Sequence, residues 1–284
     1  MDIGARVQAT LRAVLCLAWV ALLLPPQMVA FRFGWRLSRT IPMLYHRGNC
    51  WIMGLTVECR GRPSARHPTL FVSNHTSYID IIVLAAVIDA AFIAKSEVAG
   101  WPIFGLLAKL NGTVFVERRV SRAKHHRDEM QRRLDAGDSL VLFPEGTSND
   151  GQRVLRFVST FFSIAERDVG GQPLLVQPVS IAYTQLDGLP MGRRNRPLFA
   201  WYGDMELMDH LWTVLGLGRA TVGVTFHEPV TIADFASRKD MALGCQAVVA
   251  AGVSDMLSGR EATPASAAAG ARLTADRPVL ESNS

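Results

Sequence analysis

The chain has 284 residues, of which 49% are apolar and only 19% are charged, with a formal net charge of +5. This length allows one large domain or two small ones, with apolar surface left over after a large core is buried. A basic, apolar-rich chain is typical of binding to a membrane surface or a nucleic acid. The arginines are widely spread and no nucleic-acid-binding module is present, so the sequence favours a membrane over nucleic acid.

The N-terminal stretch is the first predicted element. Ala13 to Leu24 is a run of twelve apolar residues, shorter than the about 20 that a bilayer-spanning helix needs. Pro25-Pro26 is expected to end this helix, and an amphipathic stretch from Gln27 to Leu44 follows. Residues 1–48 are therefore predicted to form a membrane-associated helical hairpin in one leaflet, or one kinked span. The alternative is a secretory signal peptide with a cleavage site at Met28-Val29-Ala30.

Short apolar runs then alternate with helical stretches. The predicted strands are residues 55–60, 69–73, 91–95, 113–116, 139–143, 174–182 and 221–226. The predicted helices begin at residue 79 or span residues 122–134, 157–165 and 201–217, the last of them amphipathic, for an interface or for packing. Pro178 cannot donate a ladder hydrogen bond, so its strand is expected at a sheet edge or a bulge.

This alternation indicates an α/β domain over residues 49–258, with a mixed central sheet flanked by helices. Residues 259–284 are rich in Ala, Ser, Thr, Gly and Pro and are predicted to form a disordered tail. None of the four cysteines stands in a CxxC spacing. Cys50 and Cys59 could pair, or all four could be free thiols in a reducing compartment.

His75 and Asp80 are the leading candidates for chemistry. They follow the predicted strand 69–73, and strand ends of α/β folds are where catalytic groups are usually presented. If the chain turns between them, the Asp80 carboxylate can bind one imidazole nitrogen and leave the other free to take a proton, as in a triad without its serine. The structural alternative is a helix N-terminus, capped by Asn74 or Ser77, whose dipole Asp80 complements.

Two further groups of polar residues follow predicted strands. Glu117-Arg118-Arg119 comes after strand 113–116, and the hydrogen-bonding loop from Pro144 to Gly151 comes after strand 139–143. Glu145 in that loop could orient a substrate, pair with Arg118, or cap a turn. The remaining histidines, including His210 and His227, have no partner pattern and are expected to be structural or on the surface.

Four blocks in this order resemble the glycerolipid acyltransferase family, which includes bacterial lysophosphatidate acyltransferases. They are Asn74-His75 through Asp80, Gly112 to Arg118, Phe143 to Ser148, and Val176 to Val179. Lys95-Ser96-Glu97, between the first two blocks, also matches.

The resemblance implies transfer of a fatty acyl group from acyl-CoA or acyl carrier protein to the free hydroxyl of a lysolipid. It implies that His75 is the general base and that Asp80 orients it, while Lys95, Arg118, Glu145, Gly146 and Thr147 bind substrate. No metal or other cofactor is implied. The expected location is the inner membrane, with the active site on the cytoplasmic side.

Two departures from the family bear on the acceptor. Ser148 stands where relatives that use phosphate-bearing acceptors often carry Arg, and Val158 stands where many carry Lys. Because Arg118 is retained, and Arg153 or Arg156 could replace the lost cations, 1-acyl-glycerol-3-phosphate is the expected acceptor. Lyso-ornithine lipid is the alternative. A non-catalytic lipid-binding protein on the same fold, and a hydrolase, are alternatives of other classes.

Overall fold

A computed structural model describes residues 1–101, 104–116 and 123–260. Its centre is an eight-stranded mixed sheet in the order β1-β10-β8-β2-β5-β3-β4, with β9 paired to β8. The strands of this sheet are β1 (Leu55–Arg60), β2 (Thr69–Ser73), β3 (Ala91–Lys95), β4 (Val114–Val116), β5 (Leu140–Leu142), β8 (Leu175–Leu186), β9 (Leu189–Pro190) and β10 (Ala220–Phe226). A separate hairpin pairs β6 (Asp168–Val169) with β7 (Gln172–Pro173). The prediction of a mixed α/β fold is confirmed.

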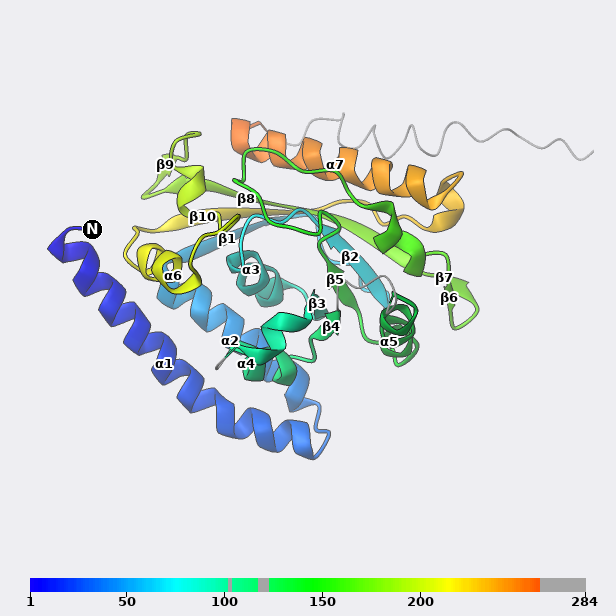
Figure 1. The fold of residues 1–284 in the computed structure, drawn as a ribbon, viewed down its shortest axis with the longest axis horizontal. Coiled ribbons are helices and arrows are strands. Elements are labelled where there is room, and N and C mark those ends of the chain that lie inside the picture. The colour runs from blue at the N-terminus through cyan, green and yellow to red at the C-terminus, as the bar shows by residue number, and fades with distance from the viewer. Residues whose placement is uncertain (102–103, 117–122, 261–284) are drawn as a thin grey trace, which may run out of the picture.

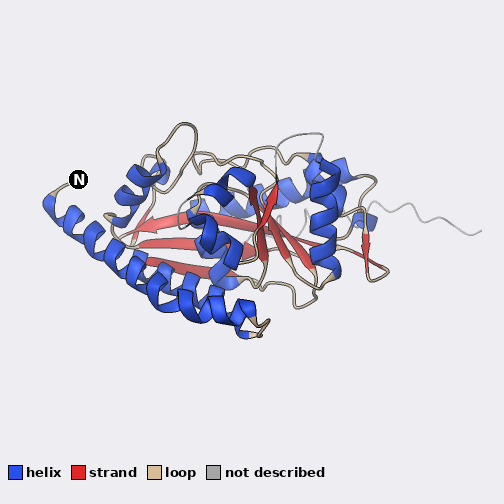
Figure 2. Ribbon diagram, turned by 60° about the horizontal axis from the view of Figure 1, so that its bottom comes forward, coloured by secondary structure: helices blue, strands red, loops and turns tan. Residues whose placement is uncertain are grey.

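Helices cover both faces of this sheet. The α-helices are α1 (Ile3–Arg32), α2 (Leu37–Met53), α3 (Ile79–Val87), α4 (Phe104–Leu110), α5 (Ala123–Asp135), α6 (Leu207–Leu215) and α7 (Arg238–Ser258). Short 3₁₀ helices span Ser96–Gly100, Ser159–Ile164, Arg196–Leu198 and Ile232–Asp234. Figure 1 shows α7 on one face of the sheet and α2 and α3 on the other, with α1 outermost. Figure 2 shows α1 running along the outside of the molecule.

Strand β2 is buried on both faces, in agreement with the apolar run Leu70-Phe71-Val72 at its centre. Leu70 and Val72 pack in the core cluster that includes α7, and Phe71 packs in the cluster that includes α3. Strand β2 pairs in parallel with β5 and β8, and β5 pairs in parallel with β3. The carboxyl ends of these four strands therefore lie at one edge of the sheet, and the loops that follow β2 and β5 meet there.

The prediction that Pro178 marks an edge or a bulge is wrong, because β8 lies between β10 and β2. Pro178 is accommodated just beyond the last β10 pair, Phe226 with Val179. The His227 N–H donates to the Pro178 carbonyl over 3.0 Å. The His227 carbonyl, which a residue with an N–H could have bonded, instead accepts from Gln177 Nε2 over 2.9 Å. A side chain thus replaces the ladder bond that proline cannot make.

The prediction that Pro25-Pro26 ends the first helix is also wrong, because α1 continues to Arg32. Tertiary contacts beyond the prolines hold this last part. Ala30 is fully buried, and Gln27 Nε2 donates to the carbonyls of Ser38 and Leu110. α1 and α2 then form a helical pair, and α2 continues past the predicted boundary at residue 48 to Met53. Gly54, at φ +75°, ends it in the left-handed conformation that glycine adopts at low cost.

Three other helices differ from expectation. The predicted helix 157–165 is a 3₁₀ helix over Ser159–Ile164, and the predicted helix 201–217 shortens to α6. The long helix α7 has no counterpart among the predicted elements. Its alanines, glycines and small polar residues give weak apolar periodicity, yet it packs along β8 with Val249 buried. The predicted tail from residue 261 onward lies outside the described residues.

All four cysteines are free thiols, so the pairing of Cys50 with Cys59 is excluded. His210 and His227 occupy structural positions, as expected. His210 Nδ1 lies 3.0 Å from the Tyr78 hydroxyl, and His227 Nε2 lies 2.7 Å from Ser180 Oγ.

His227 should make the stability of the fold depend on pH. Burial lowers its pKa from 6.5 to about 4, although the nearby Asp255 opposes the shift. The unfolded chain therefore binds this proton more tightly than the folded chain does. The free energy of unfolding is for this reason highest above pH 6.5 and decreases as the pH falls toward 4. Between pH of about 7 and 5 the loss is about 2 kcal/mol. Unfolding free energies measured at both pH values should show this slope, and His227→Gln should reduce it; an unchanged slope would contradict the assignment.

Candidate active site

The predicted contact between His75 and Asp80 is present. His75 Nδ1 lies 3.0 Å from Asp80 Oδ2, and the Asp80 side chain is fully buried while that of His75 is 19% exposed. A carboxylate only accepts hydrogen bonds, so Nδ1 carries the proton and Nε2 keeps its lone pair. Nε2 is thus the nitrogen available to take a proton from a substrate. The imidazole also stacks on Phe143, with ring centroids 4.1 Å apart, and this fixes the ring plane.

The turn that brings Asp80 back to His75 is organised by Asp80 itself. Its Oδ2 also accepts from the backbone N–H groups of Thr76 and Ser77, over 2.6 and 2.9 Å. The carboxylate therefore closes the turn that leads into α3 and orients the imidazole with the same oxygen. Of the structural alternative raised from the sequence, Asp80 does lie in the first turn of α3, where its charge complements the helix dipole. The N-cap position is Tyr78, which makes no side-chain cap bond, while Ser77 Oγ accepts from the Ile79 N–H over 3.3 Å and Asn74 bonds Ile181 instead.

Tyr183 holds the second oxygen of this carboxylate. Its hydroxyl donates to Asp80 Oδ1 over 2.9 Å, and its ring stacks on Phe199 with centroids 5.1 Å apart. Burial, together with the charge of Asp80, raises the pKa of Tyr183 well above its ordinary value, so the hydroxyl stays a donor. Sequence reasoning did not single out Tyr183. The available signal was a tyrosine directly after the predicted strand 174–182, because a buried tyrosine hydroxyl needs a partner.

The Asn74 side chain supports β8 where this strand extends past the end of β2 toward Tyr183. The last β2–β8 pair is Ser73 with Val179. Beyond it, the Asn74 amide donates to the Ile181 carbonyl and accepts from the Ile181 N–H, each over 2.9 Å. This side chain continues the ladder by one step, so no backbone group of Ile181 is left unpaired there.

The loop after β5 holds the backbone of His75 from both sides. Glu145 Oε1 accepts from the His75 N–H over 2.9 Å, and Asn149 Nδ2 donates to the His75 carbonyl over 3.2 Å. The second Glu145 oxygen accepts from Asn149 Nδ2 and from the Leu155 N–H, over 2.7 and 3.1 Å. Burial raises the pKa of Glu145, while these hydrogen bonds oppose the shift. Of the alternatives weighed for Glu145, its contacts match the capping of a turn, and its contact with substrate stays a prediction.

The other predicted substrate-binding residues are placed as follows. Lys95 ends β3, at the same edge of the sheet as His75. Gly146 has φ +70° at the turn of the Glu145 loop, and Thr147 beside it is exposed. Arg118 lies outside the described residues. The roles of all four stay predictions.

Aromatic side chains lie beside the turn that carries His75. The backbone N–H of Trp201 donates to the Thr76 carbonyl over 3.0 Å, which holds this residue beside the turn that carries His75. The Trp201 ring makes edge contacts with Tyr78 and Trp101, at centroid distances of 5.9 and 6.2 Å. These three rings form an aromatic cluster beside the turn that carries His75.

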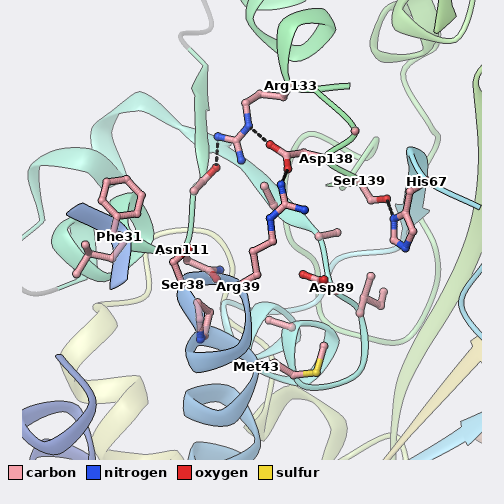
Figure 3. Close-up of a pocket in the computed structure, with 18 residues that line it drawn as sticks. Phe31, Ser38, Arg39, Met43, His67, Asp89, Asn111, Arg133, Asp138 and Ser139 are labelled. Carbon is pink, nitrogen blue, oxygen red and sulfur yellow. Dashed lines mark hydrogen bonds and ion pairs between the residues drawn. The ribbon is translucent and has the colours of Figure 1, made fainter. Parts of the chain in front are cut away.

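A pocket of about 380 Å³ lies at the other end of the parallel strands (Figure 3). Its lining includes Ala91 at the start of β3 and Ser139 just before β5. There Arg39 and Arg133 both bind Asp138, over 2.9 and 2.7 Å. None of the predicted site residues lines it, so this pocket is separate from the His75–Asp80 centre.

Comparison with known proteins decides the family. The family model described as "Acyltransferase" matches residues 56–182, which contain His75, Asp80 and the Glu145 loop. A lyso-ornithine lipid O-acyltransferase of Brucella abortus is 45% identical over 80% of this chain and 86% of its own length. The chain belongs to the glycerolipid acyltransferase family. It is an O-acyltransferase of the glycerolipid type, as the sequence motifs predicted.

Other acyltransferases of this family are also similar. A lyso-ornithine lipid O-acyltransferase of Rhizobium meliloti is 41% identical over 89% of this chain and 90% of its own length. A 1-acyl-sn-glycerol-3-phosphate acyltransferase of Neisseria gonorrhoeae is 32% identical over 63% of this chain and 67% of its own length. The crystal structure of the acyltransferase PlsC from Thermotoga maritima shares the fold, with a TM-score of 0.63, 24% identity, and coverage of 90% of this chain and 97% of that chain. Acyl transfer to a lysolipid, as predicted, is supported by these relatives.

Proposed function

We propose that His75 is the general base of a direct acyl transfer from a thioester to a lysolipid hydroxyl. Nε2 takes the hydroxyl proton as the oxygen attacks the thioester carbonyl carbon, and a new C–O bond forms. The C–S bond then breaks, and the imidazolium returns the proton to the departing thiolate. Asp80 keeps the required tautomer and stabilises the imidazolium. The observation that carries this mechanism is the 3.0 Å contact between His75 Nδ1 and a carboxylate that is fully buried.

We propose lyso-ornithine lipid as the acceptor. The relatives at 45% and 41% identity carry that activity in their names. Ser148, at the position where phosphate-type relatives often have Arg, donates from Oγ to the Trp201 carbonyl and so serves a structural role. Val158, at the second cation position, is apolar and 42% exposed. Neither Ser148 nor Val158 supplies a cation that could bind a phosphate. This favours lyso-ornithine lipid, whose head carries a carboxylate and an ammonium, over an acceptor that carries a phosphate.

Lysophosphatidate, the acceptor expected from the sequence, is the second candidate. The Neisseria relative, named for 1-acyl-sn-glycerol-3-phosphate, favours it, as does the retained Arg118. The deciding experiment compares both lysolipids side by side with one acyl donor. Strong turnover of lyso-ornithine lipid with little from lysophosphatidate supports the first candidate, and the reverse ratio supports the second.

The acyl donor and the location are further parts of this proposal. The donor is an acyl thioester of coenzyme A or of acyl carrier protein, and neither a metal nor another cofactor takes part in the proposed steps. The enzyme lies on the cytoplasmic side of the inner membrane, which is where such donors are made. α1 supports a membrane location, because by length and composition it is apolar enough to cross a membrane.

Contacts at both ends of α1 favour a helix that lies in one leaflet over one that crosses the bilayer. Near its start, Arg12 donates to the carbonyls of Leu215 and Leu217, and near its end Gln27 donates to Leu110. A helix tied to the domain at both ends lies alongside it. Its outward face, rich in exposed apolar side chains, is then free to enter the lipid.

Charges on this outward face should release the enzyme from membranes. Leu11 and Leu22 are 58% and 64% exposed, so Leu11→Glu with Leu22→Glu should leave the fold intact. Burying a charge in the acyl layer is costly, so vesicle-bound enzyme should fall by about 10-fold or more. Flotation with vesicles measures this, and Leu189→Glu, on an exposed hairpin, is a control outside α1. Equal membrane binding by both variants would contradict the proposed location of α1.

A further inference from the structure

Five arginines gather on two loops next to the catalytic turn. They are Arg153 and Arg156 on the loop after β5, and Arg193, Arg194 and Arg196 on the loop between β9 and α6. We name this group the arginine rim. Four of the five side chains are exposed, and Arg196 is half-buried.

Ordered turns present these arginines. The Asn195 N–H donates to the Gly192 carbonyl over 3.0 Å, which closes a turn with Arg193 and Arg194 at its tip. On the other loop, the N–H groups of Gly151 and Gln152 donate to the side chains of Asn149 and Asp150, just before Arg153. The rim therefore has a fixed backbone rather than a loose one.

The rim is tied directly to the catalytic centre. Gln152 Nε2 donates to the Arg193 carbonyl over 3.2 Å, which joins the two loops. Gly151 packs against Thr76, since a Cβ at Gly151 would lie 3.0 Å from Thr76 Cγ2. Thr76 follows His75 directly in the chain. The backbone of the rim therefore packs beside the turn that carries His75.

The charges of the rim are not neutralised. None of its arginines forms an ion pair with a carboxylate within the described part of the chain. Burial, and in second place repulsion by the charge of Arg193, lower the pKa of Arg196. Unpaired like charges on a rigid surface cost stability. They are typical of a surface that meets a partner of opposite charge.

We propose that the arginine rim docks the acidic surface of acyl carrier protein as it delivers the acyl chain to His75. This rests on the proposed function and names the donor. Because the arginines are mostly exposed and spread over two loops, they suit an extended acidic surface better than one phosphate, which a few convergent and partly buried donors bind best. A protein docked here would place its thioester beside the aromatic group of Trp201.

The test is the double variant Arg193→Glu/Arg194→Glu, assayed with palmitoyl-acyl carrier protein and with palmitoyl-CoA at saturating lysolipid in detergent micelles. The matched control is Arg62→Glu/Arg66→Glu, with the same charge change on the exposed loop before β2, at the opposite end of that strand. We expect the rim variant to lose about 10- to 100-fold in kcat/KM for the carrier protein. With palmitoyl-CoA it should stay within about threefold of wild type, as the control should with both donors. About 0.5 M NaCl should bring the wild-type kcat/KM for the carrier protein close to that of the variant.

Three results would overturn the proposal. Equal losses of kcat/KM with both donors would indicate that the rim binds phosphate groups that both donors share. A rise confined to the KM for the lysolipid would indicate that the rim binds the acceptor or the lipid surface. A rim variant that matches the control would assign it no role. Wild-type transfer from palmitoyl-CoA separates these failures from failure of the acyltransferase itself, since that activity depends on His75 and not on the rim.

Discussion

Replacing His75 with alanine is expected to lower kcat about 1000-fold while the protein stays folded. A positioned general base contributes about 100- to 10,000-fold, and here it is the group that activates the hydroxyl. The variant removes Nε2 but leaves Asp80 bonded to the N–H groups of Thr76 and Ser77, so the turn keeps its shape. The backbone bonds from His75 to the Glu145 loop are also kept.

The measurement is acyl transfer to the lysolipid under saturating donor, with unfolding followed by circular dichroism in the same detergent. His75→Gln is a useful companion, because it restores side-chain bulk on Phe143 without a ring nitrogen that can take the proton. Both variants should be equally slow. Turnover near the wild-type rate in a folded His75→Ala protein would exclude the proposed mechanism, and free fatty acid release by the wild-type enzyme without lysolipid would indicate a hydrolase instead.

Local sequence was enough to predict the contact between His75 and Asp80. His75 and Asp80 are five positions apart across one turn, so their meeting requires only that the chain turn there. Tyr183 could not be found in this way, because it is 103 positions from Asp80 and arrives through the pairing of β2 with β8. Asn74 was part of the motif, but its role in continuing the ladder depends on the same pairing.

The prolines show why local rules failed elsewhere. Pro25 and Pro26 are poor residues for a helix interior, and Pro178 is a poor residue for a central strand. Tertiary contacts override both rules, through the buried Gln27 and Ala30 in α1 and through the Gln177 side chain in β8. The residues that Gln27 and Gln177 bond, Leu110 and His227, are distant from them in sequence, so no local pattern predicts these contacts. The missed helix α7 likewise depends on its packing along β8.

Replacing Asp80 with asparagine should lower kcat about 100- to 10,000-fold, with little change in stability. The amide oxygen can take the place of Oδ2 and still accept from Thr76 and Ser77, while the amide nitrogen faces the Tyr183 hydroxyl, which can turn to accept. The hydrogen bonds of the turn are therefore kept. The oxygen that faces His75 Nδ1 is kept too, so what is lost is the negative charge that stabilises the imidazolium.

Asp80→Ala and Tyr183→Phe distinguish the effect of the Asp80 charge from the effect of the hydrogen bonds that this carboxylate accepts. Asp80→Ala leaves two backbone N–H groups without their acceptor, so it should lower both kcat and the free energy of unfolding, the latter by about 2–4 kcal/mol. Tyr183→Phe removes one bond to the carboxylate but keeps its charge, so it should cost only about 10-fold in kcat, which corresponds to about 1.4 kcal/mol. Kinetics and thermal unfolding of the three variants measure both effects. If Asp80→Asn were as unstable as Asp80→Ala, or as active as Tyr183→Phe, the carboxylate would act through the fold of the turn and not through its charge on His75.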